Sequence, residues 1–377
     1  MILKKIDLIS PEITLFFHGS LSHSSIISGI LTIVTGILIV SGSIFYIRYI
    51  FNREIECPKV STFNRFAEDA GEFPINSSSF FHFVSIDKDY HYHGDEEFDF
   101  TLFNLIGLDT YIQDYEYDNN LTKYNHWLYG FCNNETDTQG ISYLTTQKFF
   151  TNSACIKKYY NSSEKQYYDV GDSNFKWPKM SHGTFNPNKE FYTIILIKCN
   201  QDILNSVFGE EYKCKNNNEF EEKFKYGGGI HFNFIAQYVD ILKYKNPIKK
   251  YYYRIENTLD LDNYSINYLN FNPLTIITHN GYLFDNTQKE FTYVYERNDV
   301  FSHINKKNNI YMVYCLWLNN RANYYERTYG KIQNVLSDIG GLSQTIATII
   351  IFINNFINKY IIILDTESLL SKAKTVN

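Results

Sequence analysis

Two long apolar runs near opposite ends of this 377-residue chain constrain its fold more than any other feature. The first extends over residues 26–47 without a charged residue, and the second over residues 339–357. At about 1.5 Å per residue, a helix of about 22 residues covers about 33 Å, which matches the hydrocarbon core of a bilayer. The sequence therefore predicts two membrane-spanning helices, over residues 26–47 and 337–358.

Each run has an alternative interpretation. A cleaved signal peptide has an apolar core of only about 7–15 residues, whereas the first run is longer and ends in an aromatic and basic collar formed by Tyr46, Arg48, Tyr49 and Arg53. The second run contains Gln344, Asn354 and Asn355, so a buried helix of a soluble domain stays open as its alternative.

Two spans place both ends of the chain on one side of the membrane and the large middle segment on the other. We predict cytosolic tails over residues 1–25 and 359–377, and a lumenal or extracellular domain over residues 48–336. Basic residues flank the spans on both sides, so charge does not decide the orientation.

The cysteines favour an oxidising side for the middle segment. All six lie within it: Cys57, Cys132, Cys155, Cys199, Cys214 and Cys315. An even set confined to one side is typical of disulfides, although six cysteines allow 15 pairings and six free thiols are the alternative. The easiest local pairs, Cys132 with Cys155 and Cys199 with Cys214, would leave Cys57 and Cys315 to join the two ends of the domain.

The middle segment is rich in β-branched and aromatic residues, which favour strands. The predicted strands cover residues 191–199, 230–244, 249–256 and 309–318, with a hairpin over residues 274–296. Residues 114–172 are polar and weakly patterned. The expected fold class is a two-pass α-helical membrane protein with a large β-rich, sandwich-like α+β ectodomain.

The stretch LSDIGGL at residues 336–342 predicts a joint at the entrance to the second span. Upstream, residues 323–336 carry apolar and tyrosine side chains at helical spacing, which predicts a helix at the membrane interface. Ser337 and Asp338 are good N-cap residues, and Gly340 and Gly341 would allow a bend or a close helix contact. A simple cap and turn is the alternative.

A polar stripe follows on the second span. At about 100° per residue, Gly341, Gln344, Thr348 and Asn355 fall on one face. Polar groups inside a bilayer need partners, so such a face either lines a water-filled path in an oligomer or packs against other helices. The first span offers small residues for close packing at Ser25, Gly29, Thr32, Gly36 and Ser43.

The chain carries none of the common catalytic or nucleotide-binding fingerprints, so we expect no enzyme activity and no cofactor. Its net charge of −6 argues against a nucleic-acid partner. His91 and His93, with Asp95, Glu96 and Glu97 nearby, form a metal-like cluster, for which a solvated acidic loop is the alternative. Five N-x-S/T sequons do not discriminate between functions, because so much asparagine produces them by chance.

The C-terminal tail contains a candidate sorting signal. Asp365, Leu369 and Leu370 fit the acidic dileucine pattern that clathrin adaptors recognise. An amphipathic helical tail explains these residues equally well.

Two family resemblances accompany this plan. Residues 28–40 (SGILTIVTGILIV) after residues 6–12 (IDLISPE), together with IGG at 339–341, resemble the Erv/ERGIC-type cargo receptors of the early secretory pathway. HG at 18–19, PKVSTFN at 58–64 and DIGG at 338–341 resemble the degenerin and epithelial sodium channels, which are trimers. Both resemblances imply two spans around a large ectodomain.

The sequence thus leads to two functional hypotheses. The first is a non-enzymatic membrane protein that binds a protein cargo or ligand through its ectodomain, in the endomembrane system or at the plasma membrane. The second is a subunit of a trimeric cation channel whose second span lines the pore. In either case the bilayer and a homo- or hetero-oligomer are the expected partners.

Overall fold

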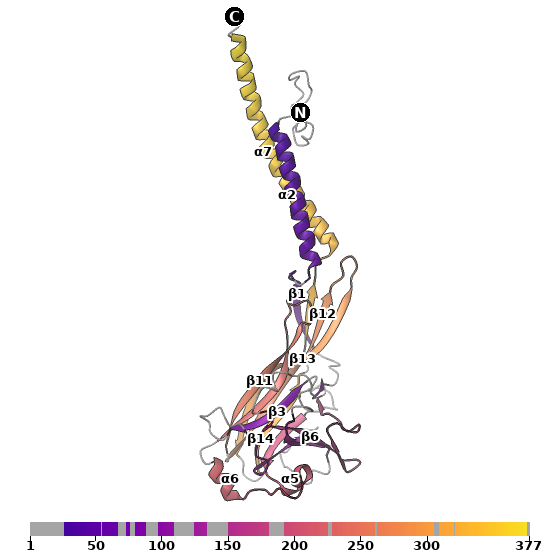
Figure 1. The fold of residues 1–377 in the computed structure, drawn as a ribbon, viewed down its shortest axis with the longest axis vertical. Coiled ribbons are helices and arrows are strands. Elements are labelled where there is room, and N and C mark those ends of the chain that lie inside the picture. The colour runs from indigo at the N-terminus through magenta and orange to yellow at the C-terminus, as the bar shows by residue number, and fades with distance from the viewer. Residues whose placement is uncertain are drawn as a thin grey trace. The chain divides into compact units, whose positions relative to one another are not determined.

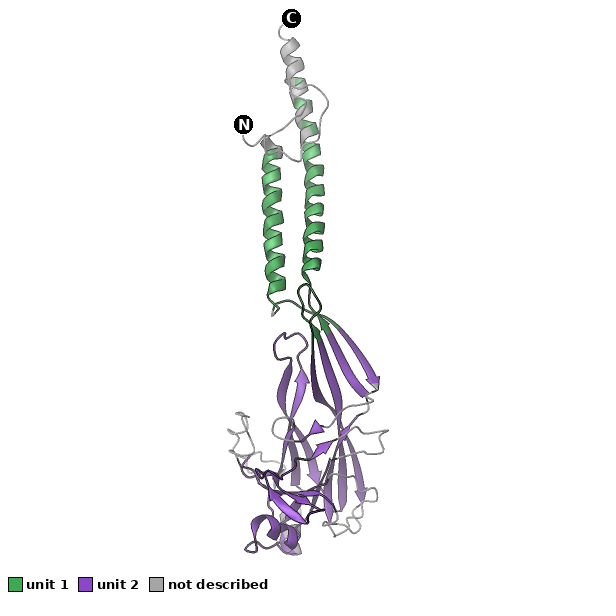
Figure 2. Cartoon of the chain, turned by 90° about the vertical axis from the view of Figure 1, so that its right-hand side faces the viewer, with its two compact units in different colours: residues 1–60, 278–288, 327–377 green, residues 61–277, 289–326 purple. Residues whose placement is uncertain are grey.

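The computed structural model describes residues 26–53, 55–66, 73–75, 80–87, 97–108, 124–133, 150–180, 192–224, 228–260, 262–304, 309–319 and 321–374. The chain forms two compact units (Figure 2). The helical unit contains residues 1–60, 278–288 and 327–377, and the β-rich unit contains residues 61–277 and 289–326.

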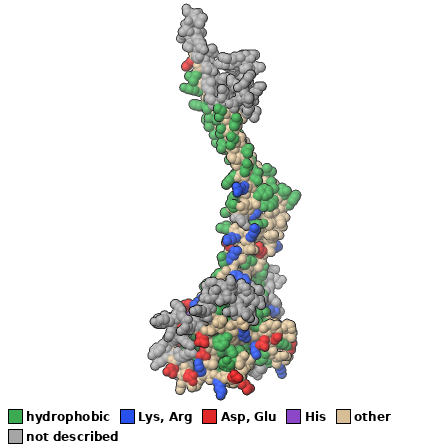
Figure 3. Space-filling model, viewed as in Figure 1, with side chains coloured by type: hydrophobic (Ala, Val, Ile, Leu, Met, Phe, Trp, Pro, Cys, Tyr) green, Lys and Arg blue, Asp and Glu red, His purple; other side chains and the backbone are tan. Residues whose placement is uncertain are grey.

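Two apolar helices dominate the helical unit. Helix α2 covers Ile26–Phe51, and helix α7 covers Ile332–Lys374, which includes the second apolar run and continues beyond it. They lie side by side (Figures 1 and 2), and hydrophobic side chains cover much of their visible face (Figure 3). Within the described residues, Gly29–Phe51 and Ile332–Ile357 are the segments long and apolar enough to cross a membrane.

The strands are short in the first half of the chain and long in the second (Figure 1). In chain order they are β1 (Lys59–Phe66), β2 (Phe73–Pro74), β3 (Phe81–Asp87), β4 (Phe103–Leu108), β5 (His126–Phe131), β6 (Ala154–Asn161), β7 (Gln166–Asp169), β8 (Lys179–Met180), β9 (Tyr192–Lys198), β10 (Gly228–Val239), β11 (Ile248–Leu259), β12 (Asn263–His279), β13 (Thr287–Ile304), β14 (Ile310–Leu318) and β15 (Arg321–Thr328). Two short helices, α5 (Gln201–Phe208) and α6 (Asn217–Phe224), lie between β9 and β10.

Within the described residues, a 13-stranded sheet follows the order β1-β15-β12-β13-β10-β3-β6-β5-β4-β9-β14. Strand β14 also pairs with β12 in parallel, so the pairings return to β12 and close a barrel. Other strands extend this barrel: β15 and then β1 continue from β12, β11 pairs with β10, and β7 pairs with β6. Strands β2 and β8 form a separate two-stranded sheet. The expected sandwich of two separate layers is therefore wrong, because the parallel β12–β14 pairing joins strands that two layers would keep apart.

Most strand predictions agree with the structure, and the errors lie at particular places. Strands β9, β10, β11 and β14 occupy the predicted segments, and the predicted hairpin is β12–β13, although β12 ends at His279. The helix expected over residues 323–336 is instead strand β15 up to Thr328, followed by the start of α7. The weakly patterned stretch 114–172 contains β5, β6 and β7; residues 109–123 and 134–149 lie outside the described residues.

The core of the β-rich unit is filled largely by aromatic rings, many of them fully buried. Each buried ring contributes about 1.5–3 kcal/mol through removal of its apolar surface from water. His82, Tyr129 and Tyr192 form a buried hydrogen-bonded chain with two links of 2.7 Å. Gly107 allows this chain, since a Cβ atom at that position would collide with the Tyr192 hydroxyl.

The buried His82 predicts that stability falls in acid. Burial lowers the pKa of His82 from 6.5 to about 3. Because the unfolded chain binds this proton below pH 6.5 and the folded chain does not, the folded state loses about 2 kcal/mol between pH 6.5 and 4.5 through His82. Denaturant unfolding at the two pH values measures this loss. His82→Phe should remove it, His303→Phe at an exposed site should not, and equal pH dependence in all three proteins would contradict the prediction.

Candidate functional site

A polar cleft of about 640 Å³ opens on the surface of the β-rich unit. Its lining includes Asn272, which is 8% exposed, and Asn319, which follows β14. The side-chain amide of Asn319 donates to the Asn272 oxygen at 2.7 Å and to a Glu296 carboxylate oxygen at 2.8 Å. One amide thus orients a second amide and a carboxylate of the cleft lining.

The walls of the cleft come from alternate residues of neighbouring strands. Strands β1 and β15 are adjacent, and side chains two positions apart on a strand share a face. This periodicity explains why the following residues line the cleft together: Thr62 and Asn64 from β1, and Arg321, Asn323 and Tyr325 from β15. Arg297 from β13 completes the lining.

The cleft offers many hydrogen-bonding groups with little net charge. Two arginines, Arg297 and Arg321, accompany the Glu296 carboxylate, and Arg297 also pairs with Asp299 through Nε at 3.1 Å. The volume falls within the roughly 300–1,000 Å³ typical of small-molecule sites. Such a lining suits a polar ligand held by amides and guanidinium groups.

The sequence does not predict the cleft, because the pattern over residues 323–336 favours a helix that includes most of β15. The signal for a strand was the alternation of Arg321, Asn323 and Tyr325, which puts three hydrogen-bonding side chains on one face. In the same stretch, Tyr325 and Tyr329 are four residues apart, a spacing that favours a helix over a strand.

The six predicted disulfide cysteines all lie in described residues. Two disulfides join the local pairs Cys132–Cys155 and Cys199–Cys214. Cys57 and Cys315 are free thiols, the first exposed and the second buried, so the predicted bridge between the ends of the domain is wrong. Burial raises the pKa of Cys315 to about 12, so the thiol stays protonated.

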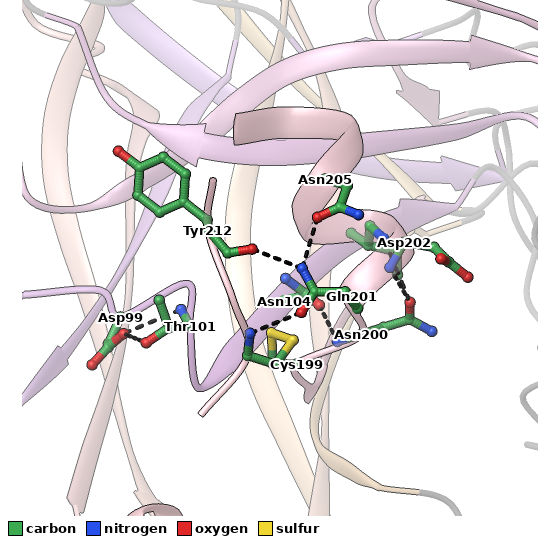
Figure 4. Close-up of a disulfide and its surroundings, with 11 residues drawn as sticks. Asp99, Thr101, Asn104, Cys199, Asn200, Gln201, Asp202, Asn205 and Tyr212 are labelled. Atoms are coloured by element: carbon green, nitrogen blue, oxygen red, sulfur yellow. Dashed lines mark hydrogen bonds between the residues drawn. A yellow bond between two sulfur atoms is a disulfide. The ribbon is translucent and has the colours of Figure 1, made fainter. Parts of the chain in front are cut away.

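The Cys199–Cys214 disulfide holds a short helix in place (Figure 4). Asn200 caps helix α5 by accepting from the backbone N–H of Asp202 at 2.9 Å. Gln201 then bridges the loop, because its side chain accepts from the Cys214 N–H at 3.0 Å and donates to the Tyr212 carbonyl at 2.7 Å.

Within the predicted joint at Ser337, Asp338, Gly340 and Gly341, the helix cap is wrong. Helix α7 begins at Ile332 and runs through all four residues, so Ser337 and Asp338 cap no helix. Nothing lies within 4 Å of a Cβ atom placed on Gly340 or Gly341.

The chain instead enters α7 beside a buried ionic cluster, here called the Arg53 cluster (Arg53, Glu56, Asn280, Tyr282 and Gly330). Arg53 is 4% exposed and Glu56 is 6% exposed, and the two form an ion pair. Arg53 also donates to the Gly330 carbonyl at 2.9 Å and lies 4.2 Å from the Tyr282 ring centroid. Glu56 accepts from the Gly330 N–H. The cluster joins three segments of the helical unit: the end of α2, the β12–β13 turn and the start of α7.

The polar stripe of α7 is exposed in the single chain. Gly341, Gln344, Thr348 and Asn355 all lie away from the α2 contact, where Leu342 packs near Gly42. The less exposed side of α7 instead contains Val335, Ile350 and Asn354, and Asn354 is fully buried. Helical periodicity assigns Asn355 to the polar stripe, but it does not reveal that the neighbouring Asn354 is the buried residue of the two. On α2 the less exposed side includes the predicted packing residues Gly29, Thr32 and Ser43 together with Thr35, whereas the predicted packing residue Gly36 is exposed.

The remaining predicted sites are only partly described. Asp365, Leu369 and Leu370 belong to the C-terminal part of α7, which stays helical to Lys374. Ser25 and the His91, His93 and Asp95 cluster lie outside the described residues. Among the residues that the structure describes, no group of histidine, cysteine and acidic side chains could hold a metal ion.

No protein-family model and no curated protein matches the chain. Two solved structures show a weak similarity. The crystal structure of Erv41p has 7% identity and a TM-score of 0.28, covering 71% of this chain and 99% of that one. A cryo-EM structure of a proton-activated chloride channel has 8% identity and a TM-score of 0.25, covering 90% and 100%. These findings agree with the weak resemblances to an Erv-type protein and to a channel, and similarity at this level carries no further argument.

Proposed function

We propose that this chain is a non-enzymatic, two-pass membrane protein whose β-rich ectodomain binds a partner in the polar cleft. Helices α2 and α7 are the spans, and the two disulfides favour a lumenal or extracellular side for the ectodomain. The observation that carries the proposal is the cleft itself, in which Asn319 holds Asn272 and Glu296 in a fixed arrangement. A preformed polar lining of this kind lowers the cost of ordering the site on binding.

Site-specific photo-crosslinking in cells tests the binding role. We expect a crosslinker at Thr62, an exposed residue of the cleft wall, to give a discrete adduct, and one at Leu242, which is 63% exposed in a turn outside the cleft, to give none. Asn319→Asp places a carboxylate against two acceptors and should reduce the Thr62 adduct at least about tenfold, equivalent to about 1.4 kcal/mol. An adduct that is insensitive to Asn319→Asp would contradict the proposal.

A second function, as a subunit of an oligomeric channel, is favoured by the exposed stripe on α7. The Thr348 hydroxyl donates to the Gln344 carbonyl at 2.8 Å, so it is satisfied within the helix. The side-chain amides of Gln344 and Asn355 each offer two donors and an acceptor, which a bilayer cannot satisfy. Copies of the same face around an axis would supply water or amide partners to these groups.

Native mass spectrometry of the full-length protein in lipid nanodiscs tests the channel hypothesis. If the stripe lines a shared axis, we expect a discrete homotrimer that conducts ions in planar bilayers. Replacing both Gln344 and Asn355 with leucine should dissociate it or change its conductance, whereas Phe352→Leu, at a position 75% exposed on α7, should do neither. A monomer, or an unchanged current in the double variant, would remove this hypothesis.

A further inference from the structure

An aromatic shelf lies on the same face of the sheet as the polar cleft. It is a shallow depression of about 510 Å³ lined by Tyr268, Phe301, His303 and Trp317, with Asn270 and Asp299 at its polar side. Phe301 is 53% exposed. Aromatic surface of this kind, beside hydrogen-bonding groups, is typical of a binding site.

Strand periodicity assembles the shelf. Tyr268 and Asn270 are two positions apart on β12, and Asn270 lies opposite Trp317 of β14 in the parallel register. Phe301 comes from β13, on the other side of β12. The Tyr268 ring contacts Phe301 and Trp317 edge-to-face, with centroids 5.6 and 6.4 Å apart. The three rings therefore support one another as a fixed platform.

The shelf and the cleft form one continuous surface. Asp299, on the shelf, accepts from the Asn270 amide at 3.0 Å and from Nε of Arg297, a cleft residue, at 3.1 Å. One step of two residues along the strands leads from Asn270 to Asn272 and from Trp317 to Asn319. A ligand lying along these strands would thus meet aromatic rings at one end and amides, carboxylates and guanidinium groups at the other.

We propose that this joined surface binds a neutral oligosaccharide; the inference rests on the proposed binding role of the cleft and names the class of its ligand. A pyranose ring has an apolar C–H face that stacks on an aromatic ring, and hydroxyl edges in which each group both donates and accepts. Trp317 and Phe301 provide the first kind of contact. The amides of Asn272 and Asn319 and the carboxylate of Asp299 provide the second.

The same surface suits other ligand classes less well. A peptide that adds a strand needs an unpaired strand edge, and β12, which contributes residues to both the cleft and the shelf, offers none because it is flanked by β13 and β14. An anionic ligand needs uncompensated positive charge, whereas Glu296 and Asp299 balance Arg297 and Arg321. A neutral, hydroxyl-rich ligand fits this balance.

The test is a binding measurement on the full-length protein in lipid nanodiscs, prepared without maltoside detergents because their sugar headgroups would compete. The probe is a glycoprotein carrying neutral N-linked oligosaccharides, immobilised before and after enzymatic removal of those oligosaccharides. We expect binding that falls at least tenfold on deglycosylation. Trp317→Leu should weaken binding at least tenfold, and Phe301→Ser, at an exposed position, should weaken it severalfold. Tyr212→Ala, which is 47% exposed in a different cavity, should leave it unchanged.

Three outcomes would overturn the assignment. Equal binding to the glycosylated and deglycosylated probe, if Asn319→Asp abolishes it, would show that the cleft recognises polypeptide. That result would keep the proposed binding function and remove the oligosaccharide as its ligand. Absence of binding to both probes, with the Thr62 crosslink to a partner intact, would also remove the oligosaccharide and keep the proposed binding function. Glycan-dependent binding that both Phe301→Ser and folded Trp317→Leu leave unchanged would place the sugar site elsewhere on the chain.

Discussion

Arg53→Ala is expected to lower the free energy of unfolding of the helical unit by about 3–5 kcal/mol, because it leaves the Glu56 carboxylate buried without its charge partner. Both side chains of this pair are less than a tenth exposed. Glu56 would keep its hydrogen bond from the Gly330 N–H, but the ion pair and the contact of Arg53 with the Tyr282 ring would be lost. Thermal and denaturant unfolding of the full-length protein in nanodiscs measures the loss.

The matched control is a second ion pair of the same unit. Lys331 pairs with Asp285 at 2.5 Å, but the two side chains are 31% and 66% exposed. Exposed pairs contribute about 0–1 kcal/mol, so Lys331→Met should change stability by less than that. If Arg53→Ala were as mild as Lys331→Met, burial of the Arg53 cluster would not have the energetic consequence that its geometry predicts.

The second large effect concerns the Cys199–Cys214 disulfide. Its cysteines are 15 residues apart and enclose helix α5. Closing a loop of this length restricts the unfolded chain and stabilises the folded one by about 3 kcal/mol. We therefore expect the double variant Cys199→Ser with Cys214→Ser to unfold more easily by about 3 kcal/mol, with loss of the ordered α5 loop.

Cys57→Ser is the control for this variant, because Cys57 is an exposed free thiol and its loss should leave stability unchanged. Peptide mapping of the protein without reduction should recover the Cys132–Cys155 and Cys199–Cys214 links. Recovery of a Cys57–Cys315 link, or equal stability of the double variant and the wild type in the absence of reductant, would contradict the prediction.

Prediction from sequence succeeded where the pattern itself is determined by burial. Strands such as β9 and β14 are nearly continuous runs of buried β-branched and aromatic residues, so their composition identifies them. The prediction for β15 failed because most of its residues are polar or half-buried, and because Tyr325 and Tyr329 fall at helical spacing by coincidence. Its extended conformation comes from pairing with β1 and β12, which are distant in sequence.

The cleft and the shelf could not be predicted from the sequence either, because they too depend on pairing between strands that are distant in sequence. Asn272, Glu296 and Asn319 are far apart along the chain, and each is unremarkable in a sequence rich in asparagine. Only the neighbouring positions of β12, β13 and β14 place them within hydrogen-bonding distance. The β12–β14 pairing, which closes the barrel, is parallel and nonlocal, so no hairpin or turn signal announces it.

The amino-acid sequence alone specified two long apolar helices and the β-rich segment between them, and it indicated the two local cysteine pairs as the easiest to join. These features depend on composition, period and short chain separation, which are all written along the chain. Tertiary packing set which side of α7 faces α2, where the chain enters α7, and which polar residues meet in the cleft. Those outcomes depend on helix rotation and on strand pairing between distant segments, and neither is encoded in any one stretch of the chain.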